Sequence, residues 1–199
     1  MKTRMMSGVL FFISLYAFGQ SIDGIKINAL HEESFSCTEH WDGQFKSVGD
    51  ALGTDCVIQQ LHEKQGRLFL RSFLNDGFKN EDWFGFNKNV LAPCNCVVEH
   101  IHINNVTNEP GVMTPGRATS ITFRTDNNER IVLAHLKDIL VRKEQKITAG
   151  EVVAKVGNNG YSRNPHVHVA AWDKDEKPLQ IQFDQKTLGM KTRAGLKPQ

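Results

Sequence analysis

Short runs of apolar and β-branched residues, separated by turn residues, are the feature that most limits the fold of this chain. From Phe45 onward the runs have the length of strands and are bounded by Gly, Asn, Pro or Asp, a pattern typical of strands joined by tight turns. The runs occupy residues 56–58, 67–71, 96–103, 120–124, 131–135, 152–156 and 166–172. No window of helical length repeats its apolar residues with the period of a helix, so helices are expected to be short at most. The sequence therefore predicts an all-β, mostly antiparallel, single domain.

The first residues have the pattern of a secretory signal. Lys2 and Arg4 precede the apolar stretch Val9–Phe18, and Ala17-Phe18-Gly19 places small residues around a cleavage site. The apolar stretch is too short to cross about 30 Å of hydrocarbon, which argues against a membrane anchor. We therefore expect residues 1–19 to be a cleaved signal peptide and the mature protein to be secreted or periplasmic, without stable membrane insertion.

Length and charge restrict the class of protein. The 199 residues leave room for one domain, and 40% hydrophobic with 23% charged residues exclude a largely disordered chain and a multi-span membrane protein. Removal of the signal takes away two cations and leaves no formal net charge, whereas a nucleic-acid binder normally keeps a basic excess. We expect an irregular lead-in over residues 20–45, a β core over 46–180 and a basic C-terminal tail over 181–199, in a monomer that binds no nucleic acid.

Four cysteines, Cys37, Cys56, Cys94 and Cys96, follow the signal. An even number of cysteines in an oxidising export route favours one or two disulfides, and four cysteines allow three connectivities. The alternative is a zinc site made of all four, for which the spacing of Cys94 and Cys96 is unsuitable.

The segment from Asn158 to Val169 contains the residues best suited to chemistry. A turn-rich Asn158-Asn159-Gly160 leads through Pro165 into a strand on which His166 and His168 point to the same face, about 7 Å apart. Two imidazoles on one face can hold a metal ion, or one can bind the ion while the other transfers a proton. His135, at the end of the apolar run 131–135, is a further single histidine.

Four segments occur in an order that resembles the C-terminal half of the lysostaphin/LytM metallopeptidase core. They are Ala134-His135-Leu136, the Lys-x-x-Ala-Gly-Glu-Val hairpin from Lys146, Val156-Gly157-Asn158-Asn159-Gly160 and Pro165-His166-Val167-His168. Upstream, Asn89-Val90-Leu91-Ala92-Pro93 looks like the segment that leads into the sheet of that family. The match covers roughly residues 48–172 and is specific from Ile131 onward.

The resemblance implies a zinc endopeptidase on a small antiparallel β-fold with an open groove, acting on peptide bonds of peptidoglycan. Transferred residue by residue, it makes His168 a zinc ligand and His135 and His166 the catalytic histidines. The family takes its other two ligands from a His-x-x-x-Asp motif. In this chain the matching segment, 49–55, ends in Asp55 but has Ala51 where the ligand histidine belongs.

Three interpretations of this departure stay open. Asp50 could replace the missing histidine beside Asp55 and His168; a side chain of residues 80–82 could enter the site; or the metal could be lost and the groove only bind. Because all three downstream histidines are present, the sequence favours a rearranged zinc site with Asp50, Asp55 and His168 as ligands. Arg163 and Asn164, just before His166, are expected to line the groove.

The sequence therefore predicts a zinc-dependent metalloendopeptidase whose substrate is a peptidoglycan peptide. One alternative is an inactive module of the same fold that binds cell wall or activates another hydrolase. A second is a biotinyl or lipoyl carrier, since residues 141–157 resemble half of such a domain. A carrier needs a modified lysine on a hairpin tip, and Met190-Lys191 instead lies in the unpatterned tail, which argues against this alternative.

Overall fold

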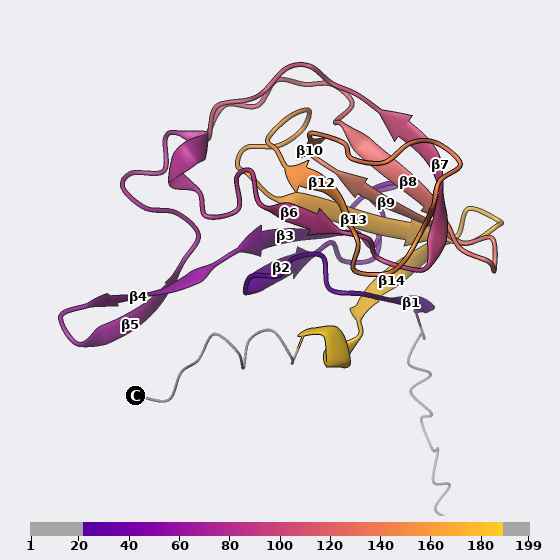
Figure 1. The fold of residues 1–199 in the computed structure, drawn as a ribbon, viewed down its shortest axis with the longest axis horizontal. Coiled ribbons are helices and arrows are strands. Elements are labelled where there is room, and N and C mark those ends of the chain that lie inside the picture. The colour runs from indigo at the N-terminus through magenta and orange to yellow at the C-terminus, as the bar shows by residue number, and fades with distance from the viewer. Residues whose placement is uncertain (1–21, 189–199) are drawn as a thin grey trace, which may run out of the picture.

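The computed structural model describes residues 22–188, so the predicted signal peptide and the end of the tail lie outside the described residues. A curled sheet of nine strands organises these residues, and a sheet of three strands accompanies it (Figure 1). The elements are β1 (Gly24–Ile27), β2 (Phe35–Glu39), β3 (Thr54–Ile58), β4 (Gln60–Lys64), β5 (Arg67–Arg71), the 3₁₀ helix η1 (Asn80–Asp82), β6 (Asn89–Leu91), β7 (Cys96–His102), β8 (Ser120–Arg124), β9 (Arg130–Ala134), β10 (Leu136–Lys137), β11 (Lys146–Ile147), β12 (Val152–Val156), β13 (Val167–Trp172) and β14 (Pro178–Phe183).

The central strand of the larger sheet is β13. One edge of β13 pairs antiparallel with β9, while its other edge is shared by β3 along its first half and by β14 at its end. The order β1-β14-β13-β9-β8-β7-β11 completes the sheet, with β2 added outside β3. All of these pairs are antiparallel except β1 with β14, which confirms the all-β, mostly antiparallel prediction.

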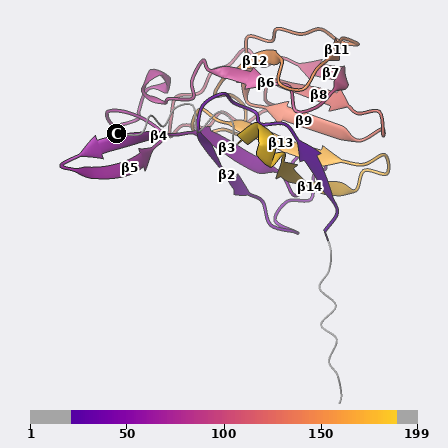
Figure 2. The ribbon, with the colours of Figure 1, turned by 60° about the horizontal axis from the view of Figure 1, so that its bottom comes forward.

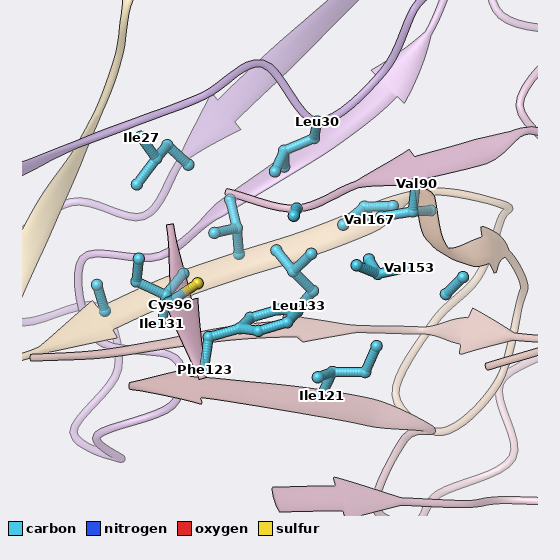
Figure 3. Close-up of a cluster of buried hydrophobic side chains, with 14 of the residues drawn as sticks. Ile27, Leu30, Val90, Cys96, Ile121, Phe123, Ile131, Leu133, Val153 and Val167 are labelled. Atoms are coloured by element: carbon cyan, nitrogen blue, oxygen red, sulfur yellow. The ribbon is translucent and has the colours of Figure 1, made fainter. Parts of the chain in front are cut away.

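The hydrophobic core is built from side chains of both sheets. Strand β9 illustrates the pattern, since Ile131 and Leu133 are fully buried while Arg130, Val132 and Ala134, which alternate with them, are half-buried. Around them lie Phe123 of β8, Val90 of β6 and Val153 of β12 (Figure 3). Each such side chain contributes about 1.5–3 kcal/mol when removed from water. Alternation along the strands thus leaves the other face of β8, β9 and β13 free to form a site.

A two-stranded hairpin, β4–β5, pairs only with itself. It extends away from the two sheets in both views (Figures 1 and 2). Its leucines Leu61, Leu68 and Leu70 are exposed, so the hairpin adds nothing to the core.

The prediction of an irregular lead-in over residues 20–45 is wrong, because β1 and β2 both form there and join the main sheet. In β1 the buried Ile25 and Ile27 alternate with exposed residues, but the run is too short to stand out in the sequence. β1 is four residues long, and β2 is mostly exposed, so backbone pairing rather than side-chain burial forms it. At the other end, β14 carries the sheet to Phe183, past the expected end of the core at residue 180, and a short helical turn follows at 185–188.

All four cysteines form disulfides, Cys37–Cys56 and Cys94–Cys96. This selects one of the three connectivities and excludes the alternative of a zinc site built from cysteines. Cys37–Cys56 links β2 to β3 at positions directly opposite each other in the ladder. Within residues 22–188, no helix is long and apolar enough to span a membrane.

Candidate metal and catalytic centre

Strand register brings the predicted site residues together. His168 of β13 lies directly opposite Asp55 of β3 on one side and opposite Ala134 of β9 on the other. Directly opposed residues in a sheet have their side chains on the same face. His135 directly follows Ala134, beyond the end of β9, and its ring centroid lies 6.1 Å from that of His168. A carboxylate and two imidazoles thus converge, although their positions in the sequence are far apart.

Asp55 and His168 are in direct contact. The Nδ1 atom of His168 lies 2.8 Å from Oδ1 of Asp55. The Nε2 atom of the same ring lies 2.8 Å from the backbone carbonyl oxygen of Gly49. Because a carbonyl only accepts hydrogen bonds, Nε2 carries the hydrogen. In the neutral ring, the Nδ1 lone pair therefore faces the carboxylate.

His135 and His166 form a second pair beside the first, with ring centroids 4.6 Å apart. Nδ1 of His135 donates to the carbonyl of Asn159, and Nδ1 of His166 donates to the carbonyl of Asn164, each at 2.8 Å. In the neutral rings, both Nε2 atoms are thus left as acceptors. Nε2 of His166 lies 3.6 Å from Oδ1 of Asp55. His135 has a positive φ of 63°, a costly backbone conformation for a non-glycine residue that is often found at functional sites.

The structure adds a histidine that sequence reasoning missed. His40 follows β2, and its ring packs beside that of His168, with centroids 5.4 Å apart and planes 29° apart. Nδ1 of His40 lies 2.8 Å from the backbone carbonyl oxygen of Asp50, and Nε2 lies 3.5 Å from Oδ2 of Asp55. Among the described residues, His40, Asp55 and His168 are the one group of potential ligands whose donor atoms all lie within 4.8 Å of each other.

Asp50 and the loop residues 80–82, the other ligands considered from the sequence, do not contact Asp55 and His168 as His40 does. Oδ1 of Asp50 is 3.9 Å from Nε2 of His168, and its carboxylate accepts a hydrogen bond from Ser47. The loop alternative is not supported, because the side chains of Asn80 and Asp82 bond to Asn158 and Asn75.

Electrostatics favour an ionised carboxylate at the centre of the site. Burial raises the pKa of Asp55, but the hydrogen bonds and positive charge that His166 and His168 offer when protonated outweigh burial and hold the pKa well below its usual range. Burial lowers the pKa of His168, while the hydrogen bond and the charge of Asp55 raise it more, to above its ordinary value. Burial, together with the charges of His166 and His168, lowers the pKa of His135 to about 3. A negative charge surrounded by imidazole nitrogens is a suitable environment for a cation.

The donor set fits zinc. Zinc prefers histidine nitrogen and carboxylate oxygen, and its ligating histidines typically donate their other N–H to a backbone carbonyl or carboxylate. His40 and His168 both meet this second condition, through the carbonyls of Asp50 and Gly49. Three protein donors leave a fourth tetrahedral position for water or substrate, as in hydrolytic zinc sites.

A cleft of about 420 Å³ opens beside the centre. His135 and His168 line it together with residues of β8, β9 and β13, and Arg117, Tyr161 and Trp172 also contribute to its wall. Its volume is that of an ordinary ligand site.

The predicted groove residues Arg163 and Asn164 are absent from the lining of this cleft. The backbone carbonyl of Asn164 instead holds the ring of His166. Direct contact of either side chain with substrate stays a prediction.

One signal in the sequence could have identified His40. Among the three cysteine connectivities, the pairing of Cys37 with Cys56 fixes the strand that ends before His40 against the strand that contains Asp55. Searching for a histidine four residues before an aspartate overlooks this, because it considers local spacing and not cross-strand neighbours.

Comparison with known proteins agrees with the fold and the order of motifs. The model of peptidase family M23 matches residues 82–180. No curated protein matches the chain in sequence.

Among solved structures, the chain is similar to a mutant catalytic domain of the prophage-encoded M23 protein EnpA from Enterococcus faecalis, with 16% identity and a TM-score of 0.47, covering 73% of this chain and 87% of that one. It is also similar to the catalytic domain of the antimicrobial peptidase lysostaphin from Staphylococcus simulans, with 14% identity and a TM-score of 0.44, covering 72% and 86%. A zinc containing peptidase from Vibrio cholerae has 14% identity and a TM-score of 0.38, covering 64% of this chain and 48% of that one. Similarity at this level says nothing about activity.

Proposed function

Because the chain belongs to peptidase family M23 through residues 82–180, we propose that it is a zinc-dependent endopeptidase that hydrolyses peptide bonds in bacterial cell-wall peptidoglycan. The observation that carries this proposal is the pairing of a potential zinc site with two free imidazole acceptors. Asp55 and His168 supply the core of the metal site. The rings of His135 and His166 lie beside it, each oriented by a backbone carbonyl at Nδ1, so that Nε2 is the acceptor in the neutral ring.

The chain's own groups suit hydrolysis of an amide. A zinc ion bound between Asp55 and His168 would lower the pKa of a bound water to about 7 and polarise the scissile carbonyl. His135 lines the cleft, and His166 packs beside it with ring centroids 4.6 Å apart. Nε2 of either ring can take the proton of the attacking water and, once protonated, return that proton to the leaving amine. The fixed Nδ1–H donors keep both rings in the tautomer that this role requires.

The cleft supports a peptide as substrate. It is lined by the face of β8, β9 and β13 that carries His168, so an extended chain can lie along it with its carbonyl near His135 and His168. Arg117, Tyr161 and Trp172 supply one cation and two aromatic faces for side-chain contacts. Export of the mature chain by the predicted signal, residues 1–19, brings it to the compartment of its substrate, and its two disulfides fit an oxidising location.

A digestion assay tests the proposal. Mature protein, loaded with one equivalent of zinc, is incubated with purified sacculi of directly crosslinked and of glycine-bridged peptidoglycan, and newly released amino groups are counted. We expect release by the wild type and a loss of at least about 100-fold in rate for His135→Ala and His166→Ala, because general acid–base groups contribute about 10²–10⁴. The exposed His100→Ala serves as the matched control.

Two outcomes would contradict the proposal. If the zinc-loaded wild type releases no amine from either wall type but sediments with sacculi, the chain is a wall-binding module. If His135→Ala and His166→Ala digest sacculi like the His100→Ala control, the site assignment is wrong even though the protein is an enzyme.

A further inference from the structure

We propose that His40 is the third protein ligand of the zinc ion, replacing the donor that is missing at Ala51, and that the Cys37–Cys56 disulfide delivers it to the site. This inference rests on the proposed zinc chemistry and concerns which side chain completes the site. It makes the metal centre dependent on a segment, residues 35–40, that lies before the region matched by the family model.

The distances suit one shared ion. Tetrahedral ligands about 2.1 Å from zinc lie about 3.4 Å from each other. Nε2 of His40 is 3.5 Å from Oδ2 of Asp55, and Nδ1 of His168 is 2.8 Å from Oδ1 of the same carboxylate. The first distance already has the required value and the second needs to open by roughly half an ångström. The two oxygens of Asp55 thus face two different rings, whose lone pairs converge.

Both rings are oriented by the same turn. Nε2 of His168 donates to the carbonyl of Gly49, and Nδ1 of His40 donates to the carbonyl of Asp50, both at 2.8 Å. In each ring this is the nitrogen that points away from Asp55. These neighbouring carbonyls belong to the segment in which the lysostaphin/LytM resemblance places the ligand histidine. Here the segment has Ala51 instead, and its backbone holds the histidines that do the binding. Gly53 allows the turn to lie close to the ring of His168, since a Cβ at position 53 would lie 2.7 Å from Cε1 of that ring.

Strand pairing explains how His40 reaches this position. The residue opposite Asp55 in β2 is Thr38, and His40 lies two positions further on, so strand alternation directs its side chain to the face of Asp55. The backbone N–H of His40 donates to the carbonyl of Gly53 at 2.8 Å, which continues the ladder beyond the end of β2. Phe45 packs against the ring, with centroids 4.6 Å apart.

The disulfide secures this otherwise weakly held strand. Cys37 and Cys56 are directly opposite residues, one position before Thr38 and one position after Asp55 in the sequence. Most of β2 is exposed and buries little apolar area. Because side-chain packing of β2 is weak, the covalent link keeps β2, and with it His40, in place beside β3.

Asp50, the third ligand expected from the sequence, is on the wrong side of His168. Its carboxylate approaches Nε2, at 3.9 Å, whereas Asp55 approaches Nδ1. One ion cannot bind both nitrogens of a single ring, because their lone pairs point in divergent directions. Nε2 is also already bonded to the carbonyl of Gly49, so His40 and not Asp50 shares an ion with Asp55 and His168.

Zinc binding by purified oxidised protein tests the inference without reference to activity. Zinc per chain is measured by elemental analysis, the Kd by competition with a chromophoric chelator, and the number of imidazole ligands by X-ray absorption. We expect one zinc with two imidazoles for the wild type. His40→Ala should weaken binding by about 100-fold or more and leave one imidazole, since even the groups that only orient ligands are worth about 10- to 100-fold. Asp50→Ala should stay within about threefold of the wild type, because its side chain neither binds the ion nor orients a ligand, and larger losses are expected only for groups that do.

A relocation variant keeps the test independent of folding damage. His40→Ala/Ala51→His restores the spacing of the family motif, and we expect it to recover most of the affinity that His40→Ala loses. Circular dichroism of the zinc-free proteins checks that each variant keeps its strands. Recovery in the double variant shows that a lost ligand, not a lost fold, caused the defect.

The outcomes separate this inference from the proposed function. The role of His40 is overturned if His40→Ala binds zinc with wild-type affinity and two imidazoles. It is also overturned if Asp50→Ala loses as much affinity as His40→Ala. Either result leaves the proposed zinc peptidase intact. A wild-type protein that binds no zinc overturns both proposals.

Discussion

Removal of the Cys37–Cys56 disulfide should cost more stability than removal of Cys94–Cys96. The first bond joins residues 19 positions apart, and the second joins residues 2 positions apart. In the chain-entropy model, closing the longer loop restricts the unfolded chain by about 3 kcal/mol at 25 °C, against about 1–2 kcal/mol for the shorter one. Cys56 is also fully buried, so its replacement by alanine adds a small loss of packing.

Urea unfolding followed by tryptophan fluorescence measures both losses. The variants are Cys37→Ala/Cys56→Ala and, as the matched control, Cys94→Ala/Cys96→Ala. A chelator is present throughout, because an ion bound only by the folded state would add its own stabilisation. With a slope of about 1–3 kcal/mol per molar urea, a loss of about 3 kcal/mol moves the midpoint by at least about 1 M.

The reasoning is refuted if the two variants lose equal stability, or if the Cys37–Cys56 variant loses less than about 1 kcal/mol. Either result would mean that β2 stays in register by itself, or that the unfolded chain already keeps these cysteines close together. The claim that the disulfide delivers His40 to the metal would then have no energetic support.

Three further predictions concern pH, the turn at the site and the core. Burial lowers the pKa of His31 to about 4, below the unfolded value of about 6.5, so the unfolded chain binds more protons between these values. Stability is therefore fully present above about pH 6.5 and falls by about 3 kcal/mol as pH drops to 4; His31→Gln should lose this part of the pH dependence in urea unfolding at several pH values. Gly53→Ala should weaken zinc binding by about tenfold or more in calorimetric titration, because the added Cβ lies 2.7 Å from the His168 ring and disturbing the groups that orient a ligand costs about 10- to 100-fold. Phe123→Ala, at a fully buried position, should lower the free energy of unfolding by about 3–5 kcal/mol, and a loss under about 1 kcal/mol would contradict the proposed core.

Most of the fold could be predicted because its central strands have a clear local pattern. In β9, Ile131 and Leu133 alternate with half-buried residues of the opposite face, and most of β8 follows the same period, whereas β13 is buried on both faces. Alternation also placed His166 and His168 on one face from the sequence alone, and the structure brings both of them close to Asp55.

The first two strands could not be predicted because long-range pairing forms them. β1 runs parallel to β14, which lies at the other end of the described chain, and its alternation of buried Ile25 and Ile27 with exposed residues spans only four positions. β2 is an edge strand with mostly exposed side chains. Hydrophobic periodicity detects burial on one face, so it gives no signal for a strand whose stability comes from backbone pairing and a disulfide.

Local sequence patterns also fail to predict the full ligand set of the metal site. A spacing motif such as His-x-x-x-Asp describes two ligands that a single turn can present, and by that motif alone the absence of histidine at position 51 leaves the metal site one ligand short. In a sheet, however, the neighbours of Asp55 are set by register as well as by sequence, and β2 places His40 3.5 Å from its carboxylate. A ligand can thus move from the turn to an adjacent strand without moving the ion. For a chain built in this way, inactivity is a sound inference only when every strand next to the remaining carboxylate also lacks a donor.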